Sequence, residues 1–397
     1  MSPQFQYAIV GRGLTGSAAA RHLAEQVPGV VLIGPDEPKD WQNHDGVFAS
    51  HYDEGRITRT IDPDENWARF ANRSIARYRD IEMRSGVTFF GEKGCLISGL
   101  TTGRSQAYMA DIRDAAQTLH VQPQLLDDAG LAKKFPYFSF PKGSDAVYEP
   151  YRAGHVSPRR LVAAQTALAE KAGGTVIRDY ATAVRQKDGF VEIDVAGGQT
   201  ITAAKVLVAA GGFTNGPGLL PEALDLKVYG RTVSFFEVDE NEADRLSAMP
   251  SMIYEPEDIM MGIYLLPPIR YPDGKFYLKI GGDIVDILLP TYKDVLDWFK
   301  RGGDAANHTH LVATMRELMP DLKISGITNT TCVTSYTPPN YPAIGWTSSP
   351  SIGVMAGGCG AAAKSSDEIG RLGTELMLHG RIIDDAYPTA DFVPRFL

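Results

Sequence analysis

Residues 7–16 read Tyr-Ala-Ile-Val-Gly-Arg-Gly-Leu-Thr-Gly, and this stretch decides the fold. The apolar run at its start predicts a short strand that is buried on both faces. The Ala-rich segment 17–26 predicts a helix, and Val-Val-Leu-Ile at 30–33 predicts a second strand. A strand, a Gly-x-Gly-x-x-Gly loop, a helix and a strand in this order are typical of the unit that binds a dinucleotide. A glycine-rich turn without a ligand is the alternative.

Each glycine of the loop has its own task in such a unit. Gly11 makes the tight turn, Gly13 lets the backbone approach a pyrophosphate, and Gly16 lets the helix pack against the strand. The helix N-terminus then holds the negative charge. The second strand normally ends in an acid that binds a ribose, but Gly34 stands there, so Asp36 is the nearest substitute.

Composition and charge exclude several classes of protein. At roughly 150 residues per domain, 397 residues predict two or three domains. A hydrophobic content of 44% and a charged content of 22% exclude a disordered or fibrous chain. The net charge is −9 and no Lys/Arg run occurs, so we expect no nucleic-acid partner.

The cysteines and histidines predict neither a disulfide framework nor a metal site. The three cysteines are odd in number, which suits a reducing compartment. No Cys or His cluster has zinc-finger spacing, and we interpret His308 and His310 as polar loop residues. The chain has no stretch of about 18 apolar residues, which is the length needed to span a bilayer. Its N-terminus does not resemble a signal peptide. We therefore expect a cytoplasmic protein without a membrane partner.

Further elements follow along the chain. Helices are predicted over 62–84, over 158–172 with Ser157 as N-cap and Pro158 at the first position, and over 364–378. Strands are predicted at 175–177, 191–195, 200–202, 205–210 and 352–358, and several short strands within 217–325. The fold class is α/β, with an α+β second domain built on a mixed sheet. A Rossmann-type domain comprises 1–85, 150–220 and 325–397, and a substrate domain comprises 86–149 and 221–324.

Five segments together resemble a known family. They are the Gly11–Gly16 loop, Ser50–Arg59, Lys205–Gly211, Tyr277–Gly281, and the stretch from Thr331 through Ala356–Gly360 to Lys364. The chain resembles the FAD-dependent amine oxidases of the D-amino-acid oxidase superfamily, in the branch of monomeric sarcosine oxidase, N-methyltryptophan oxidase and pipecolate oxidase. The resemblance runs nearly end to end, with a divergent middle, and implies that FAD is the cofactor.

The resemblance implies roles for four cations. It places Arg56 beside the flavin ring and uses Arg59 to grip a substrate carboxylate, for which a guanidinium fork is suited. The alternative is two surface arginines on a strand. It places Lys279 over the flavin, where a cation favours oxygen reduction, and the alternative is an edge-strand lysine in water. Lys364 matches a second carboxylate-binding lysine, with a solvated first-turn residue as the alternative.

Two cysteines and a tyrosine complete the expected site. Cys332 matches the position that carries flavin through a thioether bond, and a buried small hydrophobe is the alternative. Cys359 matches a small residue near the flavin, and Tyr264 lines the pocket or belongs to the core. The expected cofactor-binding residues are Gly11, Gly13, Leu14, Thr15, Gly16, Asp36, Ser50, His51, Arg56, Ala210, Gly211, Cys332, Gly357, Gly358, Cys359, Gly360 and Lys364.

The sequence departs from the family at two places. Asp283 stands where a histidine is frequent, four residues after Lys279, and Thr334 stands where an aromatic residue usually follows the cysteine. Both lie where substrate specificity is set, so the resemblance does not identify the substrate.

The implied activity is oxidation of a secondary or N-alkylated amine or amino acid. A hydride passes to flavin N5, the imine hydrolyses, and oxygen accepts the electrons to give hydrogen peroxide, so the partners are a small amine and O2. The alternatives are a flavin dehydrogenase with a carrier as acceptor, a nicotinamide-dependent reductase, and a catalytically silent flavin-binding protein. We expect a monomer or a small homo-oligomer.

Overall fold

The computed structural model describes residues 3–258 and 261–397. One sheet has the strand order β10-β11-β12-β1-β2-β9, with β20 beside the second half of β12 and β19 beside β20. Its strands are β1 (Phe5–Val10), β2 (Val30–Ile33), β9 (Thr175–Ile177), β10 (Ala181–Lys187), β11 (Phe190–Val195), β12 (Thr200–Val208), β19 (Ala343–Trp346) and β20 (Ile352–Ala356). We call it the first sheet.

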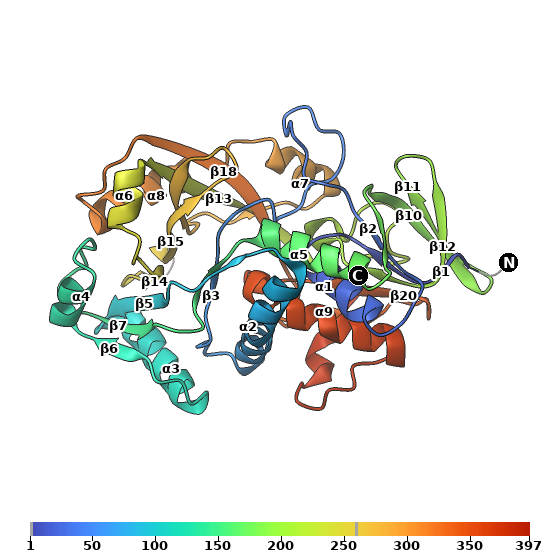
Figure 1. The fold of residues 1–397 in the computed structure, drawn as a ribbon, viewed down its shortest axis with the longest axis horizontal. Coiled ribbons are helices and arrows are strands. Elements are labelled where there is room, and N and C mark those ends of the chain that lie inside the picture. The colour runs from blue at the N-terminus through green and yellow to red at the C-terminus, as the bar shows by residue number, and fades with distance from the viewer. Residues whose placement is uncertain (1–2, 259–260) are drawn as a thin grey trace.

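The first sheet confirms the predicted dinucleotide-binding unit. β1 runs parallel to both β2 and β12, and β12 runs parallel to β20. Four consecutive residues of β2 are buried, as expected for a parallel strand covered on both faces. Helix α1 (Leu14–Ala24) connects β1 to β2, and α5 (Pro158–Lys171) and α9 (Ala362–His379) pack against it. Figure 1 shows these elements in the right half of the molecule.

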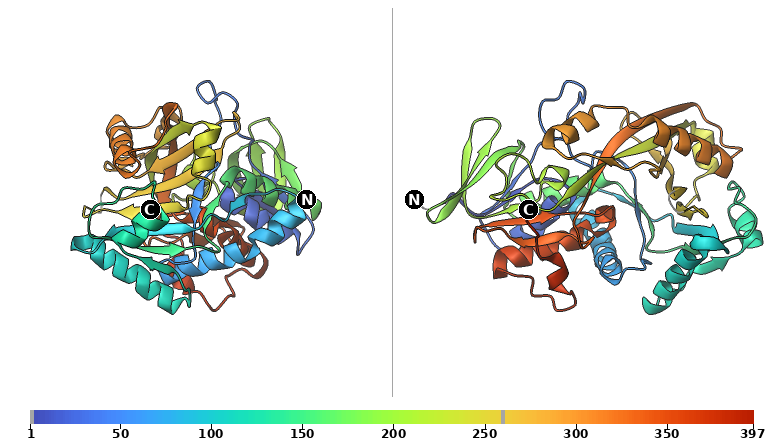
Figure 2. Two further views of the ribbon diagram at one scale, coloured as in Figure 1. Left: turned by 60° about the vertical axis from the view of Figure 1, so that its left-hand side comes forward. Right: turned by 180° about the vertical axis from the view of Figure 1, so that it is seen from behind.

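A second, larger sheet lies at the other end of the molecule (Figures 1 and 2). Its order is β17-β13-β16-β15-β14-β5-β7-β6, with β18 paired to β13. Its strands are β5 (Cys95–Leu100), β6 (Gln124–Leu126), β7 (Ser144–Glu149), β13 (Lys227–Val238), β14 (Ser251–Glu255), β15 (Ile263–Arg270), β16 (Phe276–Gly281), β17 (Ile287–Leu288) and β18 (Gly326–Tyr336). The predicted domain limits stay a prediction, and β18 pairs in this second sheet although it lies within 325–397.

Short strands and helices join the two sheets. The strands β3 (Arg56–Thr58), β4 (Phe90–Gly91) and β8 (Gly154–Val156) form a small sheet of their own. The remaining helices are α2 (Glu65–Ser85), α3 (Gly103–Thr118), α4 (Asp128–Lys134), α6 (Glu240–Arg245), α7 (Tyr292–Phe299) and α8 (Ala305–Leu318), with single turns η1 (Gly211–Phe213) and η3 (Thr389–Phe392). Within 3–258 and 261–397, no helix is both long and apolar enough to cross a bilayer.

Helix starts follow the capping signals in the sequence. Asp64 caps α2 by accepting a hydrogen bond from the backbone N–H of Trp67, and Ser157 caps α5 through Arg160 N–H. The interpretation of His308 and His310 as loop residues is wrong, because both lie within α8. Asp304 caps that helix, and Leu311 and Met315 bury one face of it against the second sheet.

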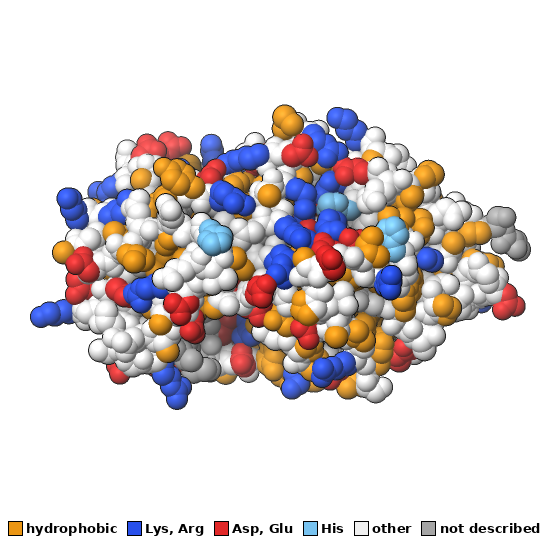
Figure 3. Space-filling view, turned by 90° about the horizontal axis from the view of Figure 1, so that it is seen from below, with side chains coloured by type: hydrophobic (Ala, Val, Ile, Leu, Met, Phe, Trp, Pro, Cys, Tyr) orange, Lys and Arg blue, Asp and Glu red, His pale blue; other side chains and the backbone are white. Residues whose placement is uncertain are grey.

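Charges of both signs mix on the surface. On the face drawn in Figure 3, lysine and arginine side chains lie among aspartate and glutamate side chains. The chain carries 39 basic and 48 acidic residues, so many of these charges have a partner of opposite sign nearby.

Candidate active site

The glycine loop between β1 and α1 is shaped to receive an anion. Gly11 has φ +114°, and a Cβ there would lie 2.2 Å from the carbonyl oxygen of Ala209. A Cβ on Gly16 would lie 1.9 Å from the carbonyl oxygen of Gly11, so both positions require glycine. Gly13 has open space where its Cβ would stand, and α1 begins there without a side-chain cap or an acid in its first turn. The free N–H groups of this turn therefore face room for a phosphate.

A deep crevice runs from this loop to the second sheet. Most of the predicted cofactor-binding residues line it. They are Gly11, Gly13, Leu14, Thr15, Ser50, His51, Arg56, Ala210, Gly211, Cys332, Gly357, Gly358 and Gly360. They come from both ends and the middle of the sequence, so folding gathers distant segments around one elongated space.

Four of the predicted cofactor-binding residues are not among those that line the crevice. Gly16 packs against Gly11, Cys359 lies between two lining glycines, and Lys364 lies further along α9. The carboxylate of Asp36 forms ion pairs with Arg12 and with Arg178, the latter at 3.1 Å. Their cofactor roles stay predictions.

Gly34 explains why no acid ends β2. A Cβ at this position would lie 2.4 Å from the backbone nitrogen of Arg12. The Arg12 guanidinium donates to the carbonyl oxygens of Gly34 (3.0 Å) and Pro35 (2.7 Å). This arginine therefore fills the space beside the end of β2.

His51 presents an unpaired nitrogen in the crevice wall. Burial, followed by the charges of Arg12, Arg159 and Arg56, lowers the pKa of His51 to about 3, so the imidazole is neutral at physiological pH. Its Nδ1 atom is buried without a hydrogen-bond partner. A buried polar atom without a partner carries a cost that a bound polar ligand removes. Together with the open turn at Gly13, this atom fits the flavin nucleotide that the sequence predicts.

Lys279 and Arg56 share one buried carboxylate. Lys279 Nζ donates to Asp53 Oδ2 at 2.5 Å and to the Gly55 carbonyl oxygen at 2.8 Å, and Arg56 pairs with the same Oδ2 atom. Lys279 is fully buried on β16, which lies between β13 and β15. The edge-strand alternative is therefore wrong.

Two tyrosines surround this lysine. Tyr271 Oη donates to Asp53 Oδ1 at 2.7 Å, and the ring of Tyr264 lies 5.4 Å from Lys279 Nζ. Burial and Arg56 lower the pKa of Lys279, while the ion pair with Asp53 favours its charged form. Tyr264 is half-buried beside the lysine rather than remote from the site.

Arg59 and Lys364 also meet at a single carboxylate. Arg59 Nη2 lies 3.2 Å from Asp62 Oδ2, and Lys364 Nζ donates to the same oxygen. Burial opposes the charge on Arg59, but Asp62 raises the pKa of its guanidinium. The structure thus brings together the two cations predicted to grip a carboxylate, and shows an acid of this chain between them.

Cys332 lines the crevice from β18. Trp298 Nε1 donates to its carbonyl oxygen at 3.0 Å, and Ser50 Oγ donates to the carbonyl oxygen of Val333 at 3.0 Å. The Cys359 N–H donates to the Ser335 carbonyl oxygen at 2.8 Å, which ties the glycine-rich turn to the same strand. The crevice wall around Cys332 is therefore fixed from two sides.

The two residues that differ from the family, Asp283 and Thr334, both lie next to Arg231. Arg231 Nε donates to Thr334 Oγ1 at 2.8 Å, and its Nη1 atom lies 3.7 Å from Asp283. Burial raises the pKa of Asp283 to about 6. Thr334 lines the crevice, whereas Arg231 and Asp283 are not among the lining residues. The two therefore lie next to the crevice without lining it.

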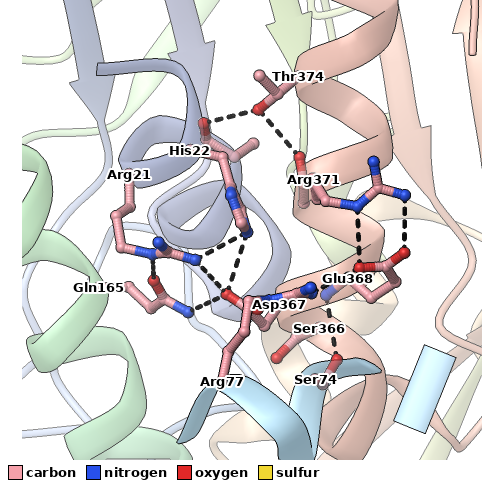
Figure 4. A network of polar contacts seen from close by, with 12 residues as sticks. Arg21, His22, Ser74, Arg77, Gln165, Ser366, Asp367, Glu368, Arg371 and Thr374 are labelled. Carbon is pink, nitrogen blue, oxygen red and sulfur yellow. Dashed lines mark hydrogen bonds and ion pairs between the residues drawn. The ribbon is translucent and has the colours of Figure 1, made fainter. Parts of the chain in front are cut away.

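Helix α9 is held by a buried polar network (Figure 4). Asp367 accepts hydrogen bonds from Arg21 (2.7 Å), Arg77 (2.5 Å) and Gln165 (2.8 Å), which come from α1, α2 and α5. Its neighbour Glu368 pairs with Arg77 and Arg371. This network fixes the helix that carries Lys364.

Sequence reasoning missed the acids of the site. Asp53 stands three residues before Arg56 and Asp62 three residues after Arg59, a spacing that was visible in the sequence. Their second partners, Lys279 and Lys364, lie 226 and 302 residues away along the chain.

Within the described ranges, no cluster of His, Cys, Asp and Glu has the arrangement of a metal site.

Two enzymes with known names are similar to this chain in sequence. The chain is 28% identical to a monomeric sarcosine oxidase of Bacillus sp. strain B-0618 over 275 residues, which are 66% of this chain and 65% of that enzyme. It is 26% identical to a monomeric sarcosine oxidase of Streptomyces avermitilis, over 100% of this chain and 99% of that enzyme.

The similarity in structure is broader than in sequence. NikD, an unusual amino acid oxidase essential for nikkomycin biosynthesis, superposes with a TM-score of 0.77 at 20% identity, over 100% of this chain and 98% of NikD. Glycine oxidase from Geobacillus kaustophilus gives a TM-score of 0.73 at 18% identity, over 99% of both chains. These two matches concern the fold. The model of the DAO family, FAD dependent oxidoreductase, matches residues 6–376, and the chain therefore belongs to this family.

Proposed function

We propose that the protein is an FAD-dependent oxidase of a secondary or N-alkylated amine or amino acid. The observation that carries this proposal is the far end of the crevice, where Arg56 and Cys332 line the wall and the buried Lys279 pairs with the same carboxylate as Arg56. The names of the relatives, which are sarcosine and N-methyl-L-tryptophan oxidases, support this substrate class.

The chain's own residues position the reactants. The α1 N-terminus holds the FAD pyrophosphate, and the neutral His51 offers its free Nδ1 to the cofactor. Arg59 and Lys364 receive the substrate carboxylate, and Tyr264 lines the pocket beside Lys279. Arg56 lies beside the flavin, and Lys279 provides positive charge where oxygen is reduced.

The cofactor supplies the redox chemistry. Bound FAD would supply the acceptor for a hydride from the carbon next to the amine nitrogen, and would transfer the two electrons to O2. The amine nitrogen loses its proton, the resulting imine is hydrolysed by water, and hydrogen peroxide is the second product. A thioether bond from Cys332 to the flavin, a cytoplasmic location and a monomeric or small homo-oligomeric state complete the proposal.

One observation favours a dehydrogenase as second candidate. The carboxylate of Asp53 lies 2.5 Å from Lys279 Nζ and offsets its positive charge. A cation stabilises developing superoxide less when an anion touches it, so a carrier protein or quinone could replace oxygen as acceptor.

The rate of reoxidation separates the two candidates. The holoenzyme is reduced by an amine without oxygen and then mixed with aerated buffer. An oxidase regains its flavin absorbance at a rate that supports turnover and forms hydrogen peroxide. Slow reoxidation in air, with rapid reoxidation by an artificial electron acceptor, would favour the dehydrogenase.

A further inference from the structure

Asp62 occupies the position between Arg59 and Lys364. One of its oxygens, Oδ2, lies 3.2 Å from Arg59 Nη2 and accepts a hydrogen bond from Lys364 Nζ. Arg59 Nη1 donates to the carbonyl oxygen of Ile61. Both terminal nitrogens of the Arg59 guanidinium therefore already have partners within the segment 59–62.

This group is closed toward the crevice. The side chains of Arg59 and Asp62 are each 11% exposed and that of Lys364 is 7% exposed. None of the three is among the residues that line the crevice. A carboxylate arriving from the crevice meets two cations that already share one anion of the chain, which offsets one of their two positive charges.

The backbone that carries the two cations is held by contacts other than those with Asp62. The carboxylate of Glu149 accepts hydrogen bonds from the backbone N–H groups of Thr60 (3.0 Å) and Ile61 (3.2 Å), which holds the chain directly after Arg59. The carbonyl oxygen of Lys364 accepts a hydrogen bond from Tyr78 Oη at 3.0 Å. The buried network of Asp367 then fixes α9 from the other side.

Asp62 itself is held through contacts of its side chain. Besides the two cations, its carboxylate accepts a hydrogen bond from the backbone N–H of Asp64 at 3.2 Å, at the turn before α2. A rotation of this one side chain would free both cations without moving the backbone that carries them.

We propose that Asp62 is an internal carboxylate that holds the place of the substrate carboxylate in the free enzyme, and thereby sets the selectivity between amino acids and amines without a carboxylate. This inference rests on the proposed function of Arg59 and Lys364. An amino acid must exchange its carboxylate for that of Asp62, whereas an uncharged substrate tail makes no such exchange. Removing the charge of Asp62 therefore favours carboxylate ligands selectively.

The test measures binding rather than turnover. Isothermal titration calorimetry compares two probes on the oxidised holoenzyme: methoxyacetate, which has the shape of N-methylglycine with an ether oxygen in place of the amine, and methoxyacetamide, its uncharged analogue. The variants are Asp62→Asn and Asp62→Ser. Glu65→Gln is the control, because it removes one acid from the same segment at a side chain that is 76% exposed.

We expect both Asp62 variants to bind methoxyacetate roughly tenfold to a hundredfold more tightly than the wild-type protein, the range of a charge-assisted hydrogen bond. Methoxyacetamide should bind equally to all four proteins, and Glu65→Gln should match the wild type with both probes. Two variants of different size are used so that a folding defect in one does not decide the result.

Three outcomes would overturn the inference. Unchanged affinity for methoxyacetate means that Asp62 does not compete with a carboxylate, and weaker binding means that it positions the cations. Absence of methoxyacetate binding to the flavin-loaded variants means that no carboxylate site exists there. Failure of the proposed function is a separate result, because it shows as absence of amine turnover by the wild-type enzyme.

Discussion

At the scale of single residues, the ion pair between Lys279 and the carboxylate of Asp53 is central to the proposed chemistry. An ammonium group that is fully buried needs a partner, and Asp53 provides it at 2.5 Å. The same carboxylate also pairs with Arg56 and accepts a hydrogen bond from Tyr271. Two cations and one anion leave a net positive charge at this end of the crevice, in keeping with the role in oxygen reduction that we propose for Lys279.

Replacing Lys279 tests this charge directly. We expect Lys279→Met to slow the reaction of the reduced flavin with oxygen by roughly a hundredfold, the usual effect of removing one preorganised charge. Anaerobic reduction by substrate should slow much less. Stopped-flow measurement of both half-reactions checks the prediction. Lys275→Met is the control, because Lys275 directly precedes the same strand and pairs with Glu237 at an exposed position. Equal slowing of both half-reactions would assign Lys279 a structural role.

The thiol of Cys332 carries a second prediction. If it forms the thioether bond, acid precipitation leaves the yellow colour in the wild-type protein pellet. We expect Cys332→Ser to release the flavin into the supernatant, whereas Cys359→Ser keeps it in the pellet. Absorbance of the two fractions measures this, and flavin in the wild-type supernatant would refute the bond.

Arg59 carries the third prediction. We expect Arg59→Ala to raise KM for an amino-acid substrate by roughly a hundredfold, because a buried charge-assisted pair is worth about 2–5 kcal/mol. The KM for the matching amide should change little. Steady-state kinetics on an N-methyl amino acid and its amide measure the difference, and an equal rise in both would exclude a carboxylate-specific role.

Sequence could predict some of these residues and not others. The glycines were predictable because their conformations and close contacts leave no alternative residue at Gly11 and Gly16. The pairing of Lys279 with Asp53 was not predictable, because the partners lie 226 residues apart. An acid three residues from an arginine is common on protein surfaces, so Asp62 gave no signal of burial by itself.

Helix α9 connects the site to the scaffold at the scale of elements. It carries Lys364 near its start and the buried pair Asp367 and Glu368 one turn later. Because Arg21, Arg77 and Gln165 reach Asp367 from three other helices, this carboxylate sets how α9 lies against the first sheet's helices (Figure 4).

Removing this charge should destabilise the protein strongly. We expect Asp367→Asn to cost about 3–5 kcal/mol, because it removes the buried carboxylate that Arg21 and Arg77 share. A lower melting temperature in a thermal scan checks the prediction. Asp80→Asn is the control, since Asp80 forms an exposed i,i+4 pair with Arg84 on α2 and should change the stability by at most about 1 kcal/mol. Equal melting temperatures for the two variants would contradict the account.

Elements with a clear cap and a regular apolar stripe were predictable. The starts of α2 and α5 followed from Asp64, Ser157 and Pro158. The elements of 86–149 were not predicted, because β6 is a short strand with mostly exposed residues, and α3 buries only a narrow stripe among polar residues. α8 was missed because the polar residues of its first two turns, which include His308 and His310, resemble a loop.

At the scale of the whole molecule, the crevice is lined by residues from both large sheets. The strands of these two sheets alternate along the chain, and the sheets lie at opposite ends of the molecule (Figures 1 and 2). The glycine loop and the ends of β12 and β20 form one side, and β18 with Cys332 forms another. Sequence predicted the returning strands of the first sheet from their terminal glycines. It predicted no strand at 326–336, where β18 pairs with β13 over Gly326–Tyr336, because strand partners are not encoded locally.

The central claim is that flavin in this crevice oxidises an amine, and one experiment tests it most directly. The purified protein is mixed without oxygen with a panel of N-methyl amino acids, cyclic imino acids and side-chain amines while its visible flavin absorbance is followed. The account predicts that at least one amine bleaches the flavin band, and that air restores the band with formation of hydrogen peroxide. A protein without flavin, or a bound flavin that no amine in the panel reduces, would contradict it.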